Sequence, residues 1–409
     1  MSAKNSSKTS TQANISKQEI LSDYKLAVLS RETSLLGRKE VLTGKAKFGI
    51  FGDGKEVAQI ALAKTFREGD WRSGYYRDQT FMMATGMYTP EDFFAQLYGQ
   101  TDVDLNPGNA GRSFNNHFAT RSLNPDGTWK DLTKMKNTSS DISPTAGQMP
   151  RLLGLAYASK LFRNIDVLKQ QTTLSHNGNE VAFGTIGDAS TSEGHFWETI
   201  NAAGVLQVPM AMTVWDDGYG ISVSKDYQTT HADISRVLDG FKKQEGDKTG
   251  YHIFKARGWN YLELIETFAK GVELCRTQHT PVLFHITELT QPQGHSTSGS
   301  HERYKTADRL AWETEYDANN QLRKWIIEQG YASNEELAEL EKQAASEAKA
   351  AKEAAWKKYQ EPIKLEREAL IKIIDNRSCI CKREHVDKVG IITNELRKIA
   401  NPIRKDNMS

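Results

Sequence analysis

Four short apolar runs, each rich in β-branched or aromatic residues, constrain the fold of this 409-residue chain more than any other feature. They occupy residues 181–186, 210–215, 252–256 and 282–287, and helix-like segments separate them. Within 261–278, for example, one helical stripe contains Leu262, Ile265, Ala269, Val272 and Cys275. Strands that alternate with helices predict an α/β fold built on a doubly wound parallel sheet. Ligands of such sheets bind beyond the carboxyl ends of the strands, so we expect the chemistry in the loops after Ile186, Trp215 and Thr287.

Charge and hydropathy exclude several classes of protein. Lys plus Arg is 53 and Asp plus Glu is 52, which leaves a net charge of +1. This balance gives no electrostatic reason to expect nucleic acid or an acidic membrane surface as a partner. No apolar run approaches the roughly 18 residues that a membrane span requires. Three cysteines cannot build a disulfide framework, so a reducing compartment is expected.

The two ends of the chain differ in character from its middle. Residues 1–18 are mostly polar and are predicted to be disordered, because they cannot bury enough apolar surface to offset their ordering entropy. They contain neither Arg nor an apolar face, which argues against a transit peptide and favours a cytoplasmic protein over one of the mitochondrial matrix. The α/β domain is expected over 19–332, a long helix or linker over 333–375 and a C-terminal tail over 376–409.

The long C-terminal helix is predicted from its start signal and its composition. Ser333 and Glu336 fit a capping box, and an Ala/Glu/Lys-rich run follows. Pro362 is expected to stop this charged helix at Glu361. Its apolar residues make a thin seam, which predicts a solvated helix that packs on a partner. The seam consists of Leu337, Leu340, Ala344, Ala348, Ala351 and Ala355.

Two motifs have the spacing of known binding sites but lack a residue that each site requires. Gly49, Gly54 and Lys55 have the spacing of a phosphate-binding P-loop, but Glu56 stands where Ser or Thr should hold Mg²⁺. A Gly-rich turn that opens a helix at Glu56 is therefore predicted. Cys379, Cys381 and His385 offer three of the four ligands that a structural zinc site requires, so alternating Cys residues in a short apolar strand are expected instead.

A third constellation begins at the end of the run at 181–186. Asp188 follows this run, and Asp216-Asp217 follow the run at 210–215. The two turns should lie side by side at the carboxyl edge of the sheet, which brings Asp188 and Asp217 together. Neighbouring carboxylates repel unless a cation lies between them, and Mg²⁺ characteristically bridges carboxylates to a substrate's phosphates. The backbone amides at the start of the helix from about residue 193 can also receive phosphate oxygens.

The stretch 187–222 resembles the thiamine diphosphate signature, in which Gly-Asp-Gly is followed, just under thirty residues later, by an Asn pair. It is most similar to the signature in the α subunit of 2-oxo acid dehydrogenase decarboxylases, a family that includes the pyruvate, branched-chain and acetoin enzymes. Glu198, Asn201 and Ala203, Val208-Pro209, and Gly-Tyr-x-Ile-Ser at 218–222 also match. The resemblance implies thiamine diphosphate and Mg²⁺ as cofactors. It makes the side chains of Asp188 and Asp217 and the main-chain carbonyl of Tyr219 the metal ligands, and the loop residues Gly187, Ala189 and Ser190 part of the cofactor site.

Further motifs extend this resemblance over roughly residues 25–310. Tyr76 and Arg77 resemble the family's Tyr-Arg pair, whose Arg contacts the diphosphate, a role that suits the guanidinium fork. Ser143 and Thr145 lie in a segment that resembles one near the aminopyrimidine ring. The loop at 294–298 resembles the mobile active-site loop of the branched-chain enzyme, which implies that His295 contacts the cofactor and acts in catalysis. His117, in a loop similar to the family's glycine-rich loop, is a second catalytic candidate.

Three departures from the family pattern concern the cofactor. Ala189 replaces a Gly, Trp215 replaces an Arg that contacts phosphate, and Asp217 replaces an Asn. The additional carboxylate should weaken diphosphate binding unless a further cation compensates.

The resemblance implies a subunit that decarboxylates a 2-oxo acid, expected to be branched-chain because of the His295 loop, and acylates the lipoyl group of a partner acyltransferase. The Glu that activates the cofactor belongs to the β subunit in this family. The chain is therefore expected to work in an α2β2 heterotetramer, or as the front half of a fused enzyme. A transketolase-like front half and a non-catalytic scaffold remain as alternatives.

Overall fold

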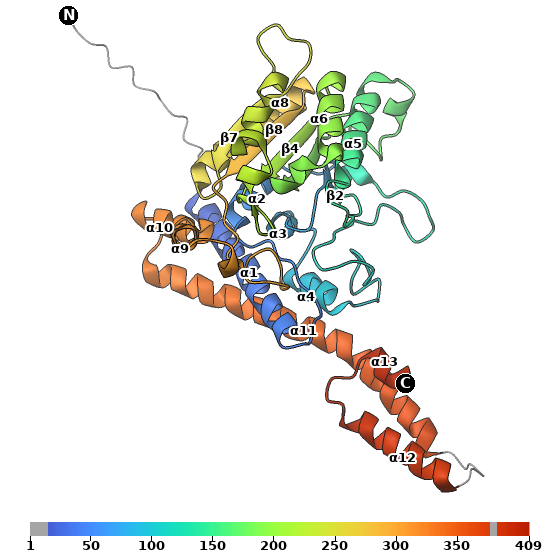
Figure 1. The fold of residues 1–409 in the computed structure, drawn as a ribbon. Coiled ribbons are helices and arrows are strands. Elements are labelled where there is room, and N and C mark those ends of the chain that lie inside the picture. The colour runs from blue at the N-terminus through green and yellow to red at the C-terminus, as the bar shows by residue number, and fades with distance from the viewer. Residues whose placement is uncertain (1–14, 377–382, 409) are drawn as a thin grey trace, which may run out of the picture.

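A computed structural model describes residues 15–376 and 383–408 of the chain (Figure 1). Its centre is a six-stranded parallel sheet in the order β2-β1-β3-β4-β8-β7. The strands are β1 (Trp71–Ser73), β2 (Asn137–Thr138), β3 (Ala182–Gly187), β4 (Met210–Trp215), β7 (His252–Arg257) and β8 (Val282–Thr287). The four apolar runs form β3, β4, β7 and β8, so the predicted doubly wound parallel sheet is confirmed. A separate antiparallel pair, β5 (Tyr219–Gly220) and β6 (Val223–Ser224), follows β4.

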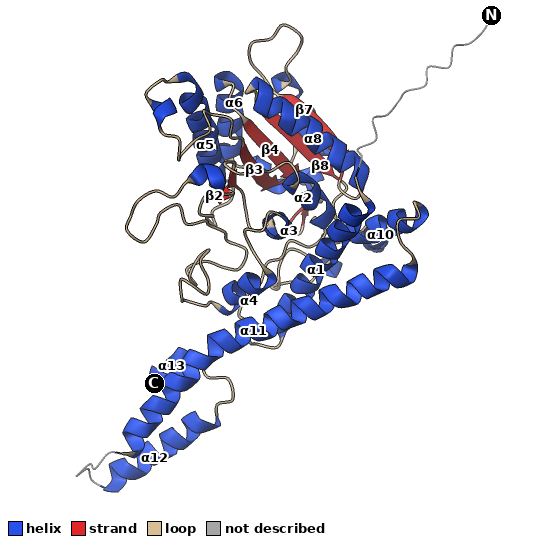
Figure 2. Ribbon diagram, turned by 180° about the vertical axis from the view of Figure 1, so that it is seen from behind, coloured by secondary structure: helices blue, strands red, loops and turns tan. Residues whose placement is uncertain are grey.

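Helices cover both faces of the sheet (Figure 2). The helices are α1 (Lys17–Leu42), α2 (Glu56–Ala63), α3 (Gln79–Ala84), α4 (Pro90–Tyr98), α5 (Gln148–Asn164), α6 (Gly194–Leu206), α7 (Ile234–Val237), α8 (Tyr261–Gln278), α9 (Ala307–Glu315), α10 (Ala318–Glu328), α11 (Asn334–Asp375), α12 (Arg383–Lys398) and α13 (Arg404–Met408). Helices α5 and α6 pack on one face, with α2 and α8 on the other. Successive strand residues point to opposite faces, so the central strands β3, β4 and β8 contribute residues to both cores and are largely apolar. In β8, for instance, Phe284 joins the α2/α8 core and Leu283 joins the α5/α6 core.

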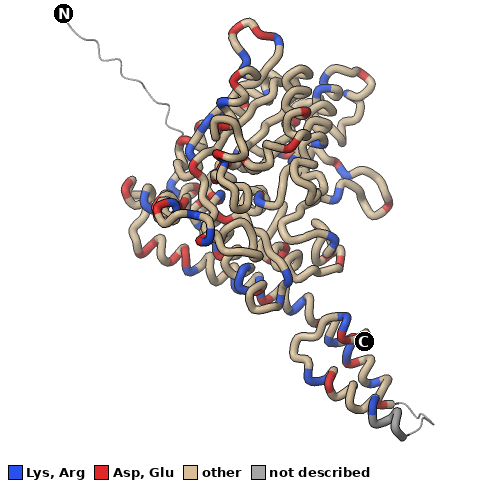
Figure 3. The backbone as a smooth tube through the Cα atoms, viewed as in Figure 1, with Lys and Arg blue, Asp and Glu red and all other residues tan. Residues whose placement is uncertain are grey.

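Helix α11 begins at the predicted capping box and packs on its own chain. Ser333 accepts a hydrogen bond from the Glu336 amide, and the Glu336 side chain accepts one from the Ser333 amide. The alanine seam packs along α1 and α4 of the same chain, which corrects the expectation that it packs on a partner, whereas most other residues of α11 are exposed or half-buried, as expected of a solvated helix. Buried seam residues are Leu337, Ala344, Ala348 and Ala355. Charges of both signs cover the remaining surface of α11 (Figure 3).

The prediction that α11 stops at Glu361 is wrong, because the helix runs through Pro362 to Asp375. A proline inside a helix has no N–H for the carbonyl four residues earlier. That carbonyl belongs to Lys358, and it accepts a hydrogen bond from Gln100 Nε2 at 3.5 Å instead. A side chain from another part of the fold thus satisfies the group that Pro362 leaves unpaired. The second half of α11 then extends from the body of the molecule beside α12 and α13 (Figure 1). Helices α12 and α13 belong to the tail predicted over 376–409.

Several predictions concern the chain ends. Helix α1 begins at Lys17, capped by Ser16, so the last residues of the segment expected to be disordered are helical. Residues 1–14, Cys379 and Cys381 lie outside the described residues, as does the side chain of His385. In the described part of the chain, no helix combines the length and hydropathy needed to cross a lipid bilayer.

Candidate active site

The carboxyl edge of the sheet brings Asp188 and Asp217 into one site. Gly187 of β3 pairs with Trp215 of β4, so the loops that follow start side by side. The ladder continues for one residue beyond the strands, because the Asp188 amide donates to the Trp215 carbonyl at 3.1 Å. The Asp216 amide likewise donates to the Ile286 carbonyl of β8 at 2.9 Å. The geometry that the spacing predicts for these two turns is therefore present.

A cavity of about 450 Å³ lies at this edge, and every predicted site residue lines it. Six chain segments supply them: the loop after β1, the loops at 117 and 143–145, the turns after β3 and β4, and the loop after β8. The predicted residues on its wall are Tyr76, Arg77, His117, Ser143, Thr145, Gly187, Asp188, Ala189, Ser190, Asp217, Tyr219 and His295. Sequence analysis missed other lining residues, among them Phe48, Ile50, Tyr75, Phe114, Ile221 and Gln291. The structure thus groups these residues, while their roles remain predictions.

Asp188 is a buried carboxylate with an unsatisfied oxygen. Its Oδ2 atom is inaccessible to solvent and has no hydrogen-bond partner. Burial, together with the charges of Asp217 and Asp216, raises the pKa of Asp188 well above its ordinary value. Such a group is costly unless a cation or a donor completes it. An unpartnered carboxylate oxygen on a residue that lines the same cavity as Asp217 fits the prediction that a hard divalent cation binds here.

The metal prediction rests on a small set of protein ligands. Within the described residues, no group of three or more His, Cys, Asp or Glu side chains could hold a metal ion. The predicted ligands, two carboxylates and one main-chain carbonyl, would therefore need oxygens from outside the protein to complete the coordination of a metal. Mg²⁺ is bound in this way in many phosphate sites, through one or two carboxylates plus substrate phosphates and water.

Lys55 is a residue of the site that sequence analysis missed. Its ammonium group donates to Asp217 Oδ2 at 2.8 Å and to the Thr290 carbonyl at 3.1 Å, and the side chain is fully buried. Although burial acts to raise the pKa of Asp217, the Lys55 and Arg77 charges lower it below its ordinary value. The predicted Gly-rich turn and the helix at Glu56 are both present. The sequence near Lys55 holds no signal for this contact, because its partner Asp217 lies far away in the chain.

Arg77 crosses from the loop after β1 to the His295 loop. Its guanidinium donates to the Phe51 carbonyl at 2.8 Å and to the His295 carbonyl at 3.0 Å, which leaves further N–H groups for a phosphate. The guanidinium lies 5.3 Å from the centre of the Tyr76 ring. Arg77 is buried, although a lone Arg in a polar loop is usually a surface residue.

Two histidines face the same cavity with different partners. His117 Nε2 lies 3.0 Å from Ser143 Oγ, and its Nδ1 lies 3.3 Å from the Asn115 carbonyl. Burial and the Arg77 charge lower the pKa of His295 to about 4. His295 is therefore neutral near pH 7 and able to accept a proton or a hydrogen bond.

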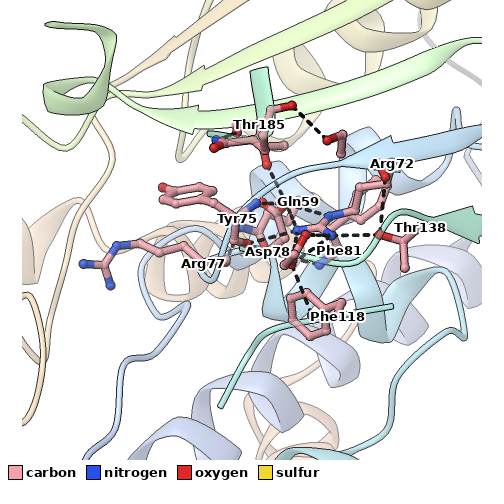
Figure 4. Close-up of polar contacts among 12 residues, drawn as sticks. Gln59, Arg72, Tyr75, Arg77, Asp78, Phe81, Phe118, Thr138 and Thr185 are labelled. Atoms are coloured by element: carbon pink, nitrogen blue, oxygen red, sulfur yellow. Dashed lines mark hydrogen bonds and ion pairs between the residues drawn. The ribbon is translucent and has the colours of Figure 1, made fainter. Parts of the chain in front are cut away.

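A buried ionic network adjoins the loop that carries Tyr75 and Arg77 (Figure 4). Arg72 donates to Asp78 at 2.7 Å and to Asp141 at 3.1 Å, and all three side chains are buried. Asp78 also accepts a hydrogen bond from the Trp215 indole at 3.3 Å. Trp215, which replaces the expected phosphate-contacting Arg, is thus a core residue. Figure 4 shows the Arg77 side chain extending away from this network.

The comparisons with known proteins agree with this architecture. Residues 24–364 match the family model described as "Dehydrogenase E1 component". The chain is 27% identical over 322 residues to the 2-oxoisovalerate dehydrogenase subunit alpha 1, mitochondrial, of Arabidopsis thaliana. It is 25% identical to the 2-oxoisovalerate dehydrogenase subunit alpha of Bacillus subtilis over 324 residues, and 25% identical to the pyruvate dehydrogenase E1 component subunit alpha of Acholeplasma laidlawii over 333 residues.

These alignments differ in how much of each relative they cover. They span 78% of this chain and 59% of the Arabidopsis protein, 78% and 84% for the Bacillus protein, and 81% and 82% for the Acholeplasma protein. The match with the Caenorhabditis elegans subunit likewise covers 60% of that relative. The family model itself covers most of the sheet and its helices, including the site described above. The chain belongs to the dehydrogenase E1 component family.

Proposed function

We propose that this chain is the α subunit, or the front half of a fused chain, of a thiamine diphosphate- and Mg²⁺-dependent 2-oxo acid decarboxylase. The observation that supports this most is the cavity at the sheet edge. There an unpartnered oxygen of Asp188 lies near Asp217, with Arg77, His117 and His295 on the same wall. In the proposal, Asp188, Asp217 and the Tyr219 carbonyl hold Mg²⁺, and Arg77 holds the diphosphate. The family assignment favours this function over a transketolase-like one.

Residues on the cavity wall have separate roles in the proposed reaction. Thiamine diphosphate, when bound, would supply the nucleophile and the electron sink for decarboxylation. His295, neutral because of its lowered pKa, would accept or return a proton near the reacting carbonyl. His117 would act from the opposite loop, oriented by Ser143. The Arg77 contact with the His295 carbonyl would couple diphosphate binding to the position of the His295 loop.

A branched-chain 2-oxo acid is the proposed substrate. Phe48, Ile50, Phe114 and Ile221 add apolar surface to the cavity, and the Phe48 and Phe114 rings lie 4.9 Å apart. Such a wall suits an aliphatic side chain better than a second charged group. The Arabidopsis and Bacillus relatives are 2-oxoisovalerate dehydrogenase subunits, which supports the same choice.

Two partner proteins belong to the proposal. In the described part of the chain, the only carboxylates that line the cavity are Asp188 and Asp217. The Glu that activates the cofactor would therefore come from a β subunit or a β-like half. A lipoyl acyltransferase would accept the acyl group. We place the assembly in the cytoplasm.

A non-catalytic scaffold has one observation in its favour, since the Lys55 ammonium already occupies an oxygen of Asp217. Calorimetry distinguishes the two functions by the heat of cofactor binding. The full chain, combined with a β-type subunit, is titrated with thiamine diphosphate in the presence of Mg²⁺. The enzyme proposal predicts saturable heat and decarboxylation of 3-methyl-2-oxobutanoate with acylation of a lipoyl domain. Absence of binding would support the scaffold.

His295→Asn should reduce acylation of the lipoyl domain on the order of 10²-fold, because it removes a proton-transfer group near the reacting atoms. Cofactor affinity should change less than about twofold, since the Arg77 contact uses the main-chain carbonyl of His295. His231→Asn, at an exposed position outside the cavity, is the matched control and should behave as the parent. Loss of cofactor binding in His295→Asn would contradict the catalytic role.

A further inference from the structure

The Lys55–Asp217 ion pair stands inside the proposed cofactor site and has no part in the chemistry derived above. The Lys55 ammonium contacts three oxygens: Asp217 Oδ2 at 2.8 Å, the Thr290 carbonyl at 3.1 Å and Gln291 Oε1 at 3.4 Å. Its side chain is 1% exposed and that of Asp217 is 8% exposed. A lysine is buried to this extent only when its charge is fully partnered.

The local fold holds Lys55 in place from both sides. Gly54 has φ +86°, and a Cβ atom there would lie 2.0 Å from the Thr290 carbonyl oxygen, so the turn fits closely against the loop after β8. On the other side, Glu56 accepts hydrogen bonds from the Gly54 amide at 2.8 Å and from Arg31 Nε at 2.7 Å. The ammonium group therefore has little freedom to leave Asp217.

The two aspartates of the site consequently differ in charge balance. Asp217 Oδ2 is paired with Lys55, and its Oδ1 accepts a hydrogen bond from the Tyr219 amide at 3.3 Å. Asp188 has no cation in direct contact among the described residues, and its Oδ2 is unpartnered. The Asp217–Lys55 pair is neutral as a unit, whereas the Asp188 carboxylate has no such cationic partner among the described residues.

We propose that Lys55 is a charge-compensating residue of the cofactor site, which lets a carboxylate at 217 coexist with a bound diphosphate. This inference rests on the proposed function. The thiamine diphosphate signature ends in an Asn at this position, and the ion pair presents the same net charge as that neutral amide. Without Lys55, two buried carboxylates would face the diphosphate and repel it. With Lys55, the metal and the diphosphate meet one uncompensated carboxylate, that of Asp188.

A double-mutant cycle in the full chain, combined with a β-type subunit, tests the inference. The two quantities measured are the unfolding temperature without cofactor and the affinity for thiamine diphosphate plus Mg²⁺, determined by calorimetry. Lys55→Gln should weaken cofactor binding on the order of tenfold or more, because the Asp217 charge then opposes the diphosphate. Asp217→Asn should lower the unfolding temperature, because it leaves a buried ammonium without its carboxylate. The double variant Lys55→Gln/Asp217→Asn should restore both quantities close to those of the parent.

The control is Lys64→Gln, which removes the same charge from an ion pair with Asp23 outside the cavity. It should leave cofactor affinity unchanged. If Lys55→Gln binds the cofactor as tightly as the parent, or if the double variant binds it no more tightly than Lys55→Gln, the inference is overturned while the proposed function stands. If Lys55→Gln does not fold, a double variant that folds and binds supports compensation, and one that does neither overturns it. Failure of the parent itself to bind would instead overturn the proposed function.

Discussion

Replacing Asp188 by Asn should reduce the Mg²⁺-dependent affinity for thiamine diphosphate by at least about 100-fold, since it removes the principal charged ligand of the metal. In the proposal, Asp188 is the decisive metal ligand because its Oδ2 atom has no protein partner, whereas both oxygens of Asp217 already accept hydrogen bonds. Calorimetry at saturating Mg²⁺ measures the change. The matched control is Asp239→Asn, an exposed aspartate outside the cavity, which should bind as the parent does.

The same substitution should make the cofactor-free protein more stable. Burial and two neighbouring carboxylates raise the pKa of Asp188 in the folded state. The folded state therefore holds this proton more tightly than the unfolded state, and ionisation of Asp188 destabilises the fold increasingly as pH rises above the unfolded pKa of about 3.9. Asp188→Asn removes that penalty. Its unfolding temperature should exceed that of the parent at pH 8, and the difference should shrink at pH 5. A less stable variant at pH 8 would show that Asp188 is a structural residue.

Arg72→Met should lower the free energy of unfolding by about 3–5 kcal/mol, the usual effect of removing one partner from a buried ionic network. Arg72 is fully buried and joins Asp78 and Asp141, so its loss leaves two buried carboxylates without their cation. Arg72 Nη2 also donates to the Tyr75 carbonyl at 3.0 Å, which fixes the loop that carries Arg77. Methionine keeps much of the volume of the side chain, so the missing charge dominates the effect.

Denaturant unfolding of Arg72→Met alongside Arg67→Met separates this network from an ordinary ion pair. Arg67 pairs with Glu273 at 3.0 Å, but both side chains are more than half exposed. Its replacement should lower the free energy of unfolding by less than about 1 kcal/mol. Equal losses in the two variants would contradict the structural role assigned to the buried network.

The sheet could be predicted from the sequence because burial on both faces imposes continuous apolar runs on the central strands β3, β4 and β8, and the remaining run became the edge strand β7. Helix α8 was predicted with its observed bounds, and Ile265, Val272 and Cys275 of the predicted stripe are buried. Ala269 is exposed, however, and Phe268 and Gly271 take its place. The close approach of Phe284 explains this, since a Cβ atom at Gly271 would lie 2.4 Å from that ring. Helical periodicity alone cannot show which glycine permits such an approach.

The rest of the site depended on contacts between residues distant in sequence. The placement of Asp188 and Asp217 at one sheet edge could be predicted because loops that follow neighbouring parallel strands begin at the same edge of the sheet. The contact between Lys55 and Asp217 joins residues 162 positions apart, and no local sequence pattern near either residue predicts it. In the same way, Gln100 allows α11 to pass Pro362 through a hydrogen bond across 258 positions. Tertiary contacts of this kind override local rules for individual residues.

A crystal structure of the full chain with thiamine diphosphate and Mn²⁺, in which anomalous scattering locates the metal, tests the central claim most directly. We expect one Mn²⁺ ion bonded to the carboxylates of Asp188 and Asp217 and to diphosphate oxygens, with Arg77 on the phosphate and Lys55 still paired with Asp217. A diphosphate bound away from this sheet edge, or a cofactor-bound structure without metal between the two aspartates, would contradict it.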